Sequence, residues 1–411
     1  MHKRFSATRE LRALTSSDIF DRSAQRMERE SLRVNNERAV LIAVATNQGI
    51  SPAQLARKTG LGAQTVARIV EFLESSGMVY RGESVRGRRG QPATPILIDP
   101  NGAYCIGCEV GWRHLTVLIR DLTGAVLGEH RRDYDFPDSH NVFAEVASLC
   151  RLMATAVPEK YRDRILGIGL AAPGGFGRNP ELVGGSEAQA AAWRDTNLAA
   201  RIAEASGLPT FLLNDGNAAC WGELVSRTPP RPDNMAYFLI SEFVGAGLIA
   251  DGRLWQGPKG NSANLGSMLV TGRDGVQNFG HRIASINALK LRVAKGGTAL
   301  HGDPLTWDWE AFKDVADEWI EDGAYAVAKT IINTSAVMEF DIVVVDGVMP
   351  RPIVTRFVDR VRAHLDKLPV LTSDRPRVEE GTLGWRAPAM GAALKPLYRR
   401  YFSRERDDVA L

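Results

Sequence analysis

Two cysteines, Cys105 and Cys108, have the CxxC spacing that can bind a metal or carry thiol–disulfide chemistry. The surrounding sequence, YCIGCEVGWRHLTVLI, alternates like a β-strand, so the two side chains should point to opposite faces of a sheet. The chain has only four cysteines in 411 residues, far too few for a disulfide scaffold. We therefore favour a structural role for both residues over metal or redox chemistry.

A second set of residues has the chemistry to read DNA. The segment AQTVARIVEFLESSG, residues 63–77, predicts a helix with its apolar side chains on one face: Val66, Ile69, Val70 and Leu73. Gln64, Thr65 and Arg68 point away from that face at the start of the helix. Glutamine can hydrogen-bond to adenine and arginine to guanine, so these three side chains are suited to base edges and phosphates.

The elements before this helix place it in a helix-turn-helix. Residues 35–48 predict one helix, and Ser51-Pro52 caps a second short one, AQLARKTG. Residues 60–62, Gly-Leu-Gly, then form a tight turn into the helix with Gln64, which would enter the major groove. We include Ser51 and Gln54 among the DNA-contacting residues. The alternative is a small helical hairpin with a solvated polar face.

The next segment, MVYRGESVRGRRGQPATPILID, alternates like a hairpin whose middle is rich in glycine and arginine. It predicts a wing carrying Arg81, Arg86, Arg88 and Arg89. Arginines that insert into a narrow, A·T-rich minor groove are stabilised by its negative potential. The alternative for this stretch is a flexible basic linker between domains. A helix-turn-helix followed by a basic wing favours DNA binding.

Charge is divided unevenly along the chain. Residues 1–100 carry 16 Lys and Arg against 10 Asp and Glu, a net charge of +6, which leaves −3 on the rest. A basic head on a mildly acidic body fits a DNA-binding module attached to another domain. No apolar run is long enough to span a membrane, and the polar N-terminus is unlike a signal peptide. We expect a cytoplasmic protein.

From residue 103 the pattern predicts strands interleaved with helices, an α/β domain. Five segments there carry a resemblance to a known family: AAPG (171–174), LPTFLLNDGNAACWGE (208–223), VGAGLIADGRLWQG (244–257), GNSANLGSM (260–268) and AMGAAL (389–394). In these segments the chain resembles the ROK family of sugar kinases and repressors. LARKTGLGAQTVARIVEFLESSGMV resembles the DNA-binding head of the repressor branch.

The resemblance implies a fold and a domain organisation. The fold class is α/β, with an N-terminal winged helix-turn-helix followed by a two-lobed actin-like (ribonuclease H-like) ATPase-type fold. We expect an N-terminal extension over 1–30, the DNA-binding domain over 31–98 and an effector-binding and dimerisation domain over 99–405. The cleft between its lobes should lie near residues 214–268.

The sequence departs from the family's kinases at all three nucleotide-binding elements. Where the DxGGTK-like turn is expected, the chain has Glu109-Val-Gly-Trp112-Arg, and a tryptophan at a glycine position blocks the approach of phosphate. The GTGxG loop is replaced by residues 241–245, in which Phe243 is bulky and Glu242 would repel a polyphosphate. The GGG-like turn on the adenosine side begins with Asp346. We expect neither ATP binding nor enzyme activity, and no cofactor.

The family's zinc site is also absent from the sequence. Ser267 stands at the position of its histidine, and no cysteine follows Cys220. Zinc needs about four nitrogen or sulfur ligands, so no metal is expected. We interpret His281 as an ordinary polar histidine.

The sugar site is partly retained. Asn214 and Asp215 match the family's sugar contact and catalytic base, although a carboxylate can equally accept a hydrogen bond from a bound sugar. The family's sugar-contacting Glu and His become Asn264 and Ser267. These changes predict an effector that differs from the usual hexoses. Two cleft residues, Pro173 and Gly174, complete the predicted effector site.

These observations favour a transcription regulator, a repressor of carbohydrate uptake or catabolism genes that responds to a sugar or sugar derivative. Its partners would be a double-stranded DNA operator and that effector, and not a membrane. The chain would act as a homodimer or dimer of dimers, because a helix-turn-helix usually binds paired half-sites. Two alternatives stay open: a bifunctional regulator that retains sugar kinase activity, and a constitutive DNA binder with a vestigial sensor.

Overall fold

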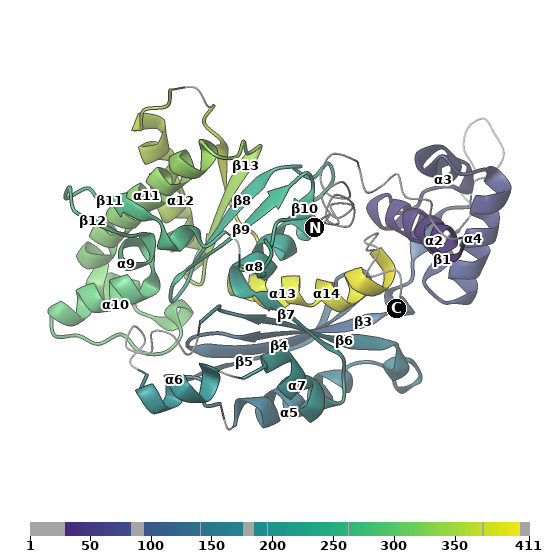
Figure 1. Ribbon diagram of the computed structural model, residues 1–411, viewed down its shortest axis with the longest axis horizontal. Helices are drawn as coiled ribbons and strands as arrows, with labels where there is room; N and C mark the ends of the chain where they lie inside the picture. The colour runs from purple at the N-terminus through teal and green to yellow at the C-terminus, as the bar shows by residue number, and fades with distance from the viewer. Residues whose placement is uncertain are drawn as a thin grey trace, which may run out of the picture.

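The computed structural model describes residues 29–83, 94–139, 141–175, 185–194, 196–261, 263–371 and 374–402. A small head lies beside a larger body that is built from two α/β lobes (Figure 1). In these described ranges, no helix combines the length and the apolar character needed to cross a membrane.

The head is a winged helix-turn-helix. Its elements are α2 (Arg29–Thr46), α3 (Pro52–Thr59), α4 (Ala63–Ser75), β1 (Val79–Arg81) and β2 (Ile96–Ile98). The predicted cap of α3 is confirmed: Ser51 Oγ accepts from the Gln54 backbone N–H, and the Gln54 side chain accepts from the Ser51 N–H. Gly60 ends α3 at φ +69°, a left-handed conformation that favours glycine. Strands β1 and β2 pair antiparallel, so the described ends of the predicted wing form a hairpin.

The first lobe of the body is a five-stranded sheet in the order β5-β4-β3-β6-β7. Its strands are β3 (Tyr104–Val110), β4 (His114–Asp121), β5 (Val126–Asp133), β6 (Ile165–Ala172) and β7 (Thr210–Asn214). Its outer helices are α5 (Val142–Ala154), α6 (Glu187–Arg194) and α7 (Leu198–Ser206). Strands β3 to β5 form an antiparallel meander, and β6 and β7 continue the sheet parallel to β3.

The CxxC cysteines lie on β3 and face opposite sides of this sheet, as predicted. Cys108 packs in the cluster under α5, whereas Cys105 packs in the cluster shared with the head. Both thiols are buried and free of disulfides. Burial raises the pKa of Cys105 to about 12, so this thiol stays protonated and unreactive at neutral pH.

The second lobe has a sheet in the order β10-β9-β8-β13-β14. Its strands are β8 (Met235–Ile240), β9 (Val244–Ala250), β10 (Arg253–Leu254), β13 (Ile342–Gly347) and β14 (Arg377–Glu380). The helices packed on one face are α10 (Ile286–Lys295), α11 (Lys313–Ser335) and α12 (Arg351–Lys367). A small hairpin and a short helix lie at the outer end: β11 (Leu269–Thr271), β12 (Gln277–Phe279) and α9 (Gly280–Ala284).

A helical layer separates the two sheets (Figure 1). It consists of α8 (Asp215–Ser226), α13 (Ala387–Ala392), α14 (Leu394–Leu397) and the π-helical turn η9 (Tyr398–Phe402). Glycines allow α13 to pack very closely: a Cβ at Gly169 of β6 would lie 1.7 Å from the Ala392 carbonyl oxygen, and one at Gly391 would lie 1.7 Å from the Ala218 carbonyl oxygen. Helix α13 therefore has little room to shift independently of β6 or α8.

Candidate functional sites in the head and between the lobes

The predicted DNA-reading side chains lie on the outer face of α4. The apolar stripe of this helix is buried, while Gln64 and Arg68 are exposed and Thr65 is half-buried. Their position on an open helix face is the one that major-groove recognition requires. Arg86, Arg88 and Arg89 lie outside the described residues.

Ser51 and Gln54 cap α3, so their side-chain oxygens already accept hydrogen bonds and can contact DNA chiefly as donors. Ser51 Oγ and the Gln54 carbonyl oxygen each accept a backbone N–H, which leaves the Ser51 O–H and the Gln54 amide N–H free to donate. Both side chains are thus suited to phosphate oxygens. Sequence reasoning missed Arg57 and Lys58, which are exposed on the same helix beside an open groove of about 440 Å³.

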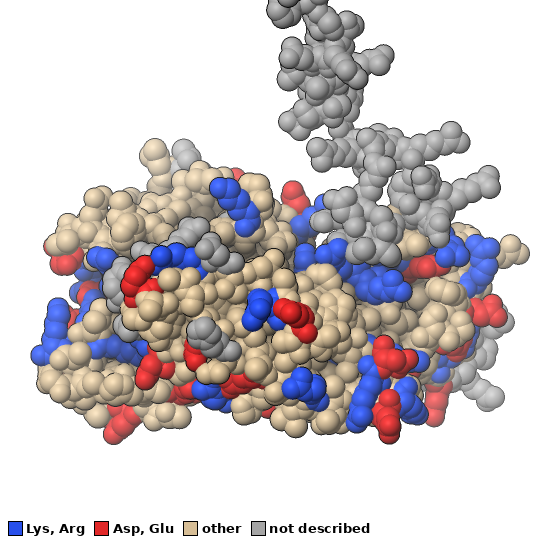
Figure 2. Space-filling model, turned by 60° about the horizontal axis from the view of Figure 1, so that its bottom comes forward, with Lys and Arg blue, Asp and Glu red and all other residues tan. Residues whose placement is uncertain are grey.

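Figure 2 shows one face of the molecule, with basic and acidic side chains interspersed over it, often as neighbours. Such a mixed face offers no continuous basic track for a polyanion.

The predicted effector site is centred on the junction between β7 and α8. Asn214 caps α8, because its Oδ1 accepts the backbone N–H of Asn217 at 3.2 Å. Its amide nitrogen donates to Asn261 Oδ1 at 3.4 Å, and the Asn217 amide donates to the Gly260 carbonyl at 3.3 Å. The 260–261 loop is thereby held against the start of α8.

Pro173 and Gly174 follow β6 directly and reach the same loop. A Cβ at Gly174 would lie 2.8 Å from Asn261 Oδ1, so this glycine is required for the close approach. The structure therefore brings Gly174 and Asn214 together through Asn261, a residue that sequence reasoning missed. Asn261 lies in the GNSANLGSM segment, three residues before the predicted Asn264.

Asp215 lies among other titratable groups. Burial, followed by the negative charge of nearby Glu109, raises the pKa of Asp215 to about 6. Glu109 is itself buried and forms an ion-pair contact of 3.1 Å between its Oε2 and His114 Nε2. Asp215 retains one local donor, the Gly216 N–H at 2.9 Å. The carboxylate is therefore a strong hydrogen-bond acceptor for a ligand hydroxyl.

Ser267 and Asn264 lie on the short turn Leu265–Ser267, and both are exposed. Ser267 Oγ lies 3.2 Å from His281 Nε2, and His281 Nδ1 accepts the Val244 N–H at 3.1 Å. Because Nδ1 is an acceptor, Nε2 carries the proton and donates to Ser267. Burial lowers the pKa of His281 to about 4, which keeps the ring neutral. The Ser267 hydroxyl proton is thus directed away from His281 and is available to a ligand.

Side chains from the two segments that resemble the kinases' phosphate loops meet between the lobes. Trp112 and Phe243 meet edge to face at 5.4 Å across the lobes. Glu242 is 9% exposed and accepts from two cations, Arg113 Nε at 3.2 Å and Lys290 Nζ at 2.7 Å. A phosphate group would have to displace this carboxylate.

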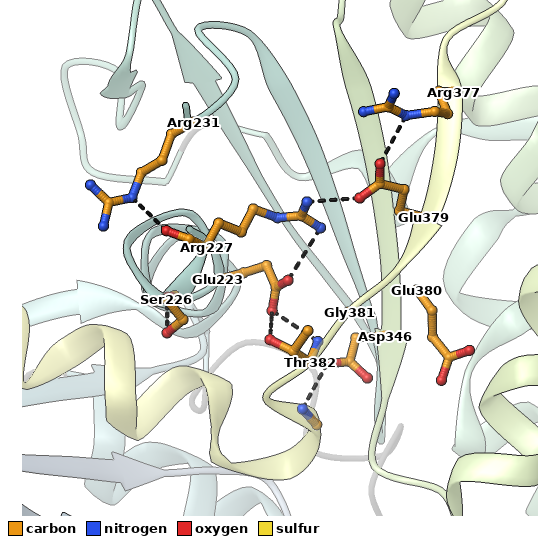
Figure 3. A network of polar contacts seen from close by, with 12 residues as sticks. Glu223, Ser226, Arg227, Arg231, Asp346, Arg377, Glu379, Glu380, Gly381 and Thr382 are labelled. Atoms are coloured by element: carbon orange, nitrogen blue, oxygen red, sulfur yellow. Dashed lines mark hydrogen bonds and ion pairs between the residues drawn. The ribbon is translucent and has the colours of Figure 1, made fainter. Parts of the chain in front are cut away.

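Asp346, which begins the segment that resembles the kinases' adenosine-side turn, lies in the polar network of Figure 3. Asp346 is fully buried and accepts from the Gly384 N–H at 2.7 Å and from Arg351 at 3.0 Å. Beside it, the buried Glu223 accepts both the N–H and the hydroxyl of Thr382 at 3.0 Å. The residues present therefore do not fit a nucleotide.

The residues present do not fit the family's zinc either. Among the described residues, no three or more His, Cys, Asp or Glu side chains are grouped closely enough to hold a metal ion. Ser267 hydrogen-bonds to His281 at the position where a zinc-site histidine was expected from the resemblance.

The fold and these sites define a class: a winged-helix head joined to a two-lobed actin-like domain. The ROK family model matches residues 105–395, and the MarR family model matches residues 35–90. The chain belongs to the ROK family.

Individual relatives include both repressors and kinases. A xylose repressor of Bacillus subtilis is 27% identical over 57% of this chain and 60% of its own length. An N-acetylmannosamine kinase of Vibrio vulnificus is 30% identical over 46% of this chain and 66% of its own length. A crystal structure of a ROK family transcriptional regulator, a homologue of the E. coli Mlc protein, superposes with a TM-score of 0.66 at 20% identity, covering 90% of this chain and 97% of that one. The matched stretch thus spans less than two thirds of the xylose repressor.

Proposed function

We propose that this chain is a cytoplasmic DNA-binding repressor of carbohydrate uptake or catabolism genes, and that an unphosphorylated sugar or sugar derivative controls it. The observation that carries the proposal is the combination of a winged-helix head with a sugar-kinase-type body whose phosphate subsite holds Glu242. The named xylose repressor and the Mlc homologue support the same function.

The absence of kinase activity follows from charge and space. Arg113 and Lys290 both pair with Glu242, so its carboxylate occupies hydrogen-bonding positions that phosphate oxygens would otherwise take. Trp112 and Phe243 occupy the volume beside them. An incoming polyphosphate would have to share these two cations with the Glu242 carboxylate, whose repulsion of one phosphate charge is about 4 kcal/mol at 4 Å for an intermediate dielectric.

The same charges define the effector that the site favours. Asp215 offers a carboxylate acceptor, Ser267 offers a hydroxyl donor, and Asn214, Asn261 and Asn264 offer amides that can do either. No cation in this set is available for an anionic ligand. A neutral polyhydroxylated molecule matches the donors and acceptors, whereas a sugar phosphate does not.

The proposed DNA contacts are Gln64, Thr65 and Arg68 on bases, Ser51 and Gln54 on phosphates, and Arg86, Arg88 and Arg89 of the wing in the minor groove. The chain would bind as a homodimer or dimer of dimers. Each head would then take one half-site, about one helical turn from the next.

A second candidate function is a regulator that still phosphorylates its sugar. Asp215 favours it, because a pKa near 6 suits a general base and because an N-acetylmannosamine kinase is among the relatives. An ADP-release assay over a panel of hexoses, pentoses and N-acetylated sugars separates the two. The repressor proposal expects background rates; sugar-dependent ADP release that Asp215→Asn abolishes would support the bifunctional alternative.

A further inference from the structure

The head contacts the C-terminal end of the described chain through a shared apolar cluster and through one buried arginine, Arg38. Arg38 of α2 is 6% exposed, and its Nη2 donates to the carbonyl oxygens of both Arg399 and Arg400 at 3.1 Å. These carbonyls belong to η9, where the last turn of a helix leaves acceptors without a helical partner. Arg38 therefore joins α2 to η9 by two hydrogen bonds.

The same turn contacts the two elements that carry the effector site. The Tyr398 ring meets Trp221 of α8 edge to face at 5.1 Å, and the Arg399 guanidinium stacks on Phe211 of β7 at 4.8 Å. Asn214 ends β7 and Asp215 begins α8. The side chains of Tyr398 and Arg399 thus contact α8 and β7, the two elements that meet at the Asn214–Asp215 junction. The backbone carbonyls of Arg399 and Arg400 accept from Arg38 of the head.

Close packing leaves little room for this turn to move independently. A Cβ at Gly222 of α8 would lie 2.9 Å from the Gly391 nitrogen, and one at Gly107 of β3 would lie 2.0 Å from the Ala389 carbonyl oxygen. Helix α13 leads directly through α14 into η9. Because α13 is packed tightly against α8, a displacement of α8 must move α13 and, through α14, the η9 turn. Figure 1 shows the segment running from beneath α8 to the base of α2.

We infer that η9 couples the effector site to the DNA-binding head, with Trp221 and Phe211 as its contacts to the site and Arg38 as the positioning residue of the head. This inference rests on the proposed function for its biological meaning. The physical coupling itself exists without sugar or DNA, so it can be tested without either. A substitution at Trp221 of α8 must therefore change how often the α2 backbone hydrogen bonds open locally, although α8 and α2 belong to different domains.

Hydrogen–deuterium exchange of the full chain, without ligand, tests this. Arg38→Met should increase exchange of the α2 amides about tenfold, the loss expected for charged hydrogen bonds, and Arg38→Lys should restore part of the protection. Arg33→Met is the matched control, because Arg33 is exposed on the same helix and pairs only with Glu37 one turn away among the contacts described. It should leave α2 unchanged.

Trp221→Leu should increase α2 exchange several-fold, and Trp221→Phe, which keeps a ring against Tyr398, should increase it less. Leu224→Ala is the control, because Leu224 packs in the cluster against the second sheet, whereas Trp221 packs in a different cluster with Tyr398. If Trp221→Leu does not fold, Phe211→Leu replaces it. Unchanged α2 exchange in the Trp221 and Phe211 variants would overturn the coupling, and so would an equal increase in Leu224→Ala. Neither outcome depends on whether the chain is a repressor.

Discussion

Glu242 and Arg113 form an ion pair between the two lobes, with 3.2 Å between Oε1 and Nε. Arg113 follows β3 of the first lobe and Glu242 follows β8 of the second, and Lys290 of α10 binds the other carboxylate oxygen at 2.7 Å. In the proposed function, the chain supplies an anion of its own in the segment that resembles the kinases' second phosphate loop.

Removing this carboxylate should destabilise the protein and create an anion site. Glu242→Ala removes the carboxylate that two partly buried cations share, which should cost about 1–3 kcal/mol of unfolding free energy. Pyrophosphate should raise the melting temperature of this variant and not that of the wild type, when compared with chloride at equal ionic strength. Glu145→Ala, which breaks the exposed pair with Arg132, is the control. Equal stabilisation of the wild type would mean that Glu242 does not occupy a phosphate subsite.

Asp215 should reduce stability at neutral pH. Its pKa is raised from 3.8 to about 6 in the folded chain, so the folded state binds this proton more tightly than the unfolded state does. Its contribution to stability therefore falls as the pH rises from about 4 to 6, and stays low above that window. Asp215→Asn, which keeps the acceptor for Gly216, should stabilise the chain by about 1–3 kcal/mol at pH 7 and by nearly nothing at pH 4. Urea unfolding at both pH values measures this, and a variant no more stable at pH 7 would contradict the placement of Asp215.

Arg68 should contribute to sequence reading. Arg68→Ala should weaken binding to an operator selected from genomic fragments by about 1–3 kcal/mol and relax the preference at one base pair. Arg253→Ala removes one exposed arginine from the second lobe and controls for net charge. Equal losses of operator affinity for the two variants in a mobility-shift titration would show that Arg68 contributes only its charge and does not read a base.

Arginines of the wing should recognise the width of the DNA minor groove. Replacing Arg88 and Arg89 together by alanine should weaken binding most at operators with A·T-rich flanks, because a narrow minor groove attracts arginine. Operators that differ only in their flanks provide the comparison. Uniform weakening across all flanks would favour the linker interpretation of this stretch.

Local sequence patterns predicted the elements of the head well because their signals are local. The Ser51 cap, the turn at residues 60–62 and the apolar stripe of α4 each depend on residues a few positions apart. The opposite orientation of Cys105 and Cys108 followed from strand alternation in the same way. The helix expected over 35–48 instead spans Arg29–Thr46.

The effector site could be predicted only in part, because its contacts join distant segments. The sequence indicated that Glu242 would repel phosphate, but its pairing with Arg113 and Lys290 depends on the turns of two lobes meeting. Asn261 was missed for the same reason, since only the fold brings it to Asn214. The contact of Arg38 with Arg399 spans 361 positions and has no local signal.

The most direct test of the proposed function is operator binding titrated with sugars, followed by fluorescence anisotropy, with ADP release measured in parallel. At least one unphosphorylated sugar should weaken operator binding by roughly 5- to 150-fold, the usual range of coupling between two sites. ATP should have no effect and release no ADP. Asp215→Ala should bind the operator like the wild type without sugar and lose the response to it. Operator binding that no sugar or polyol alters, or sugar-dependent ADP release that Asp215→Asn abolishes, would contradict the account.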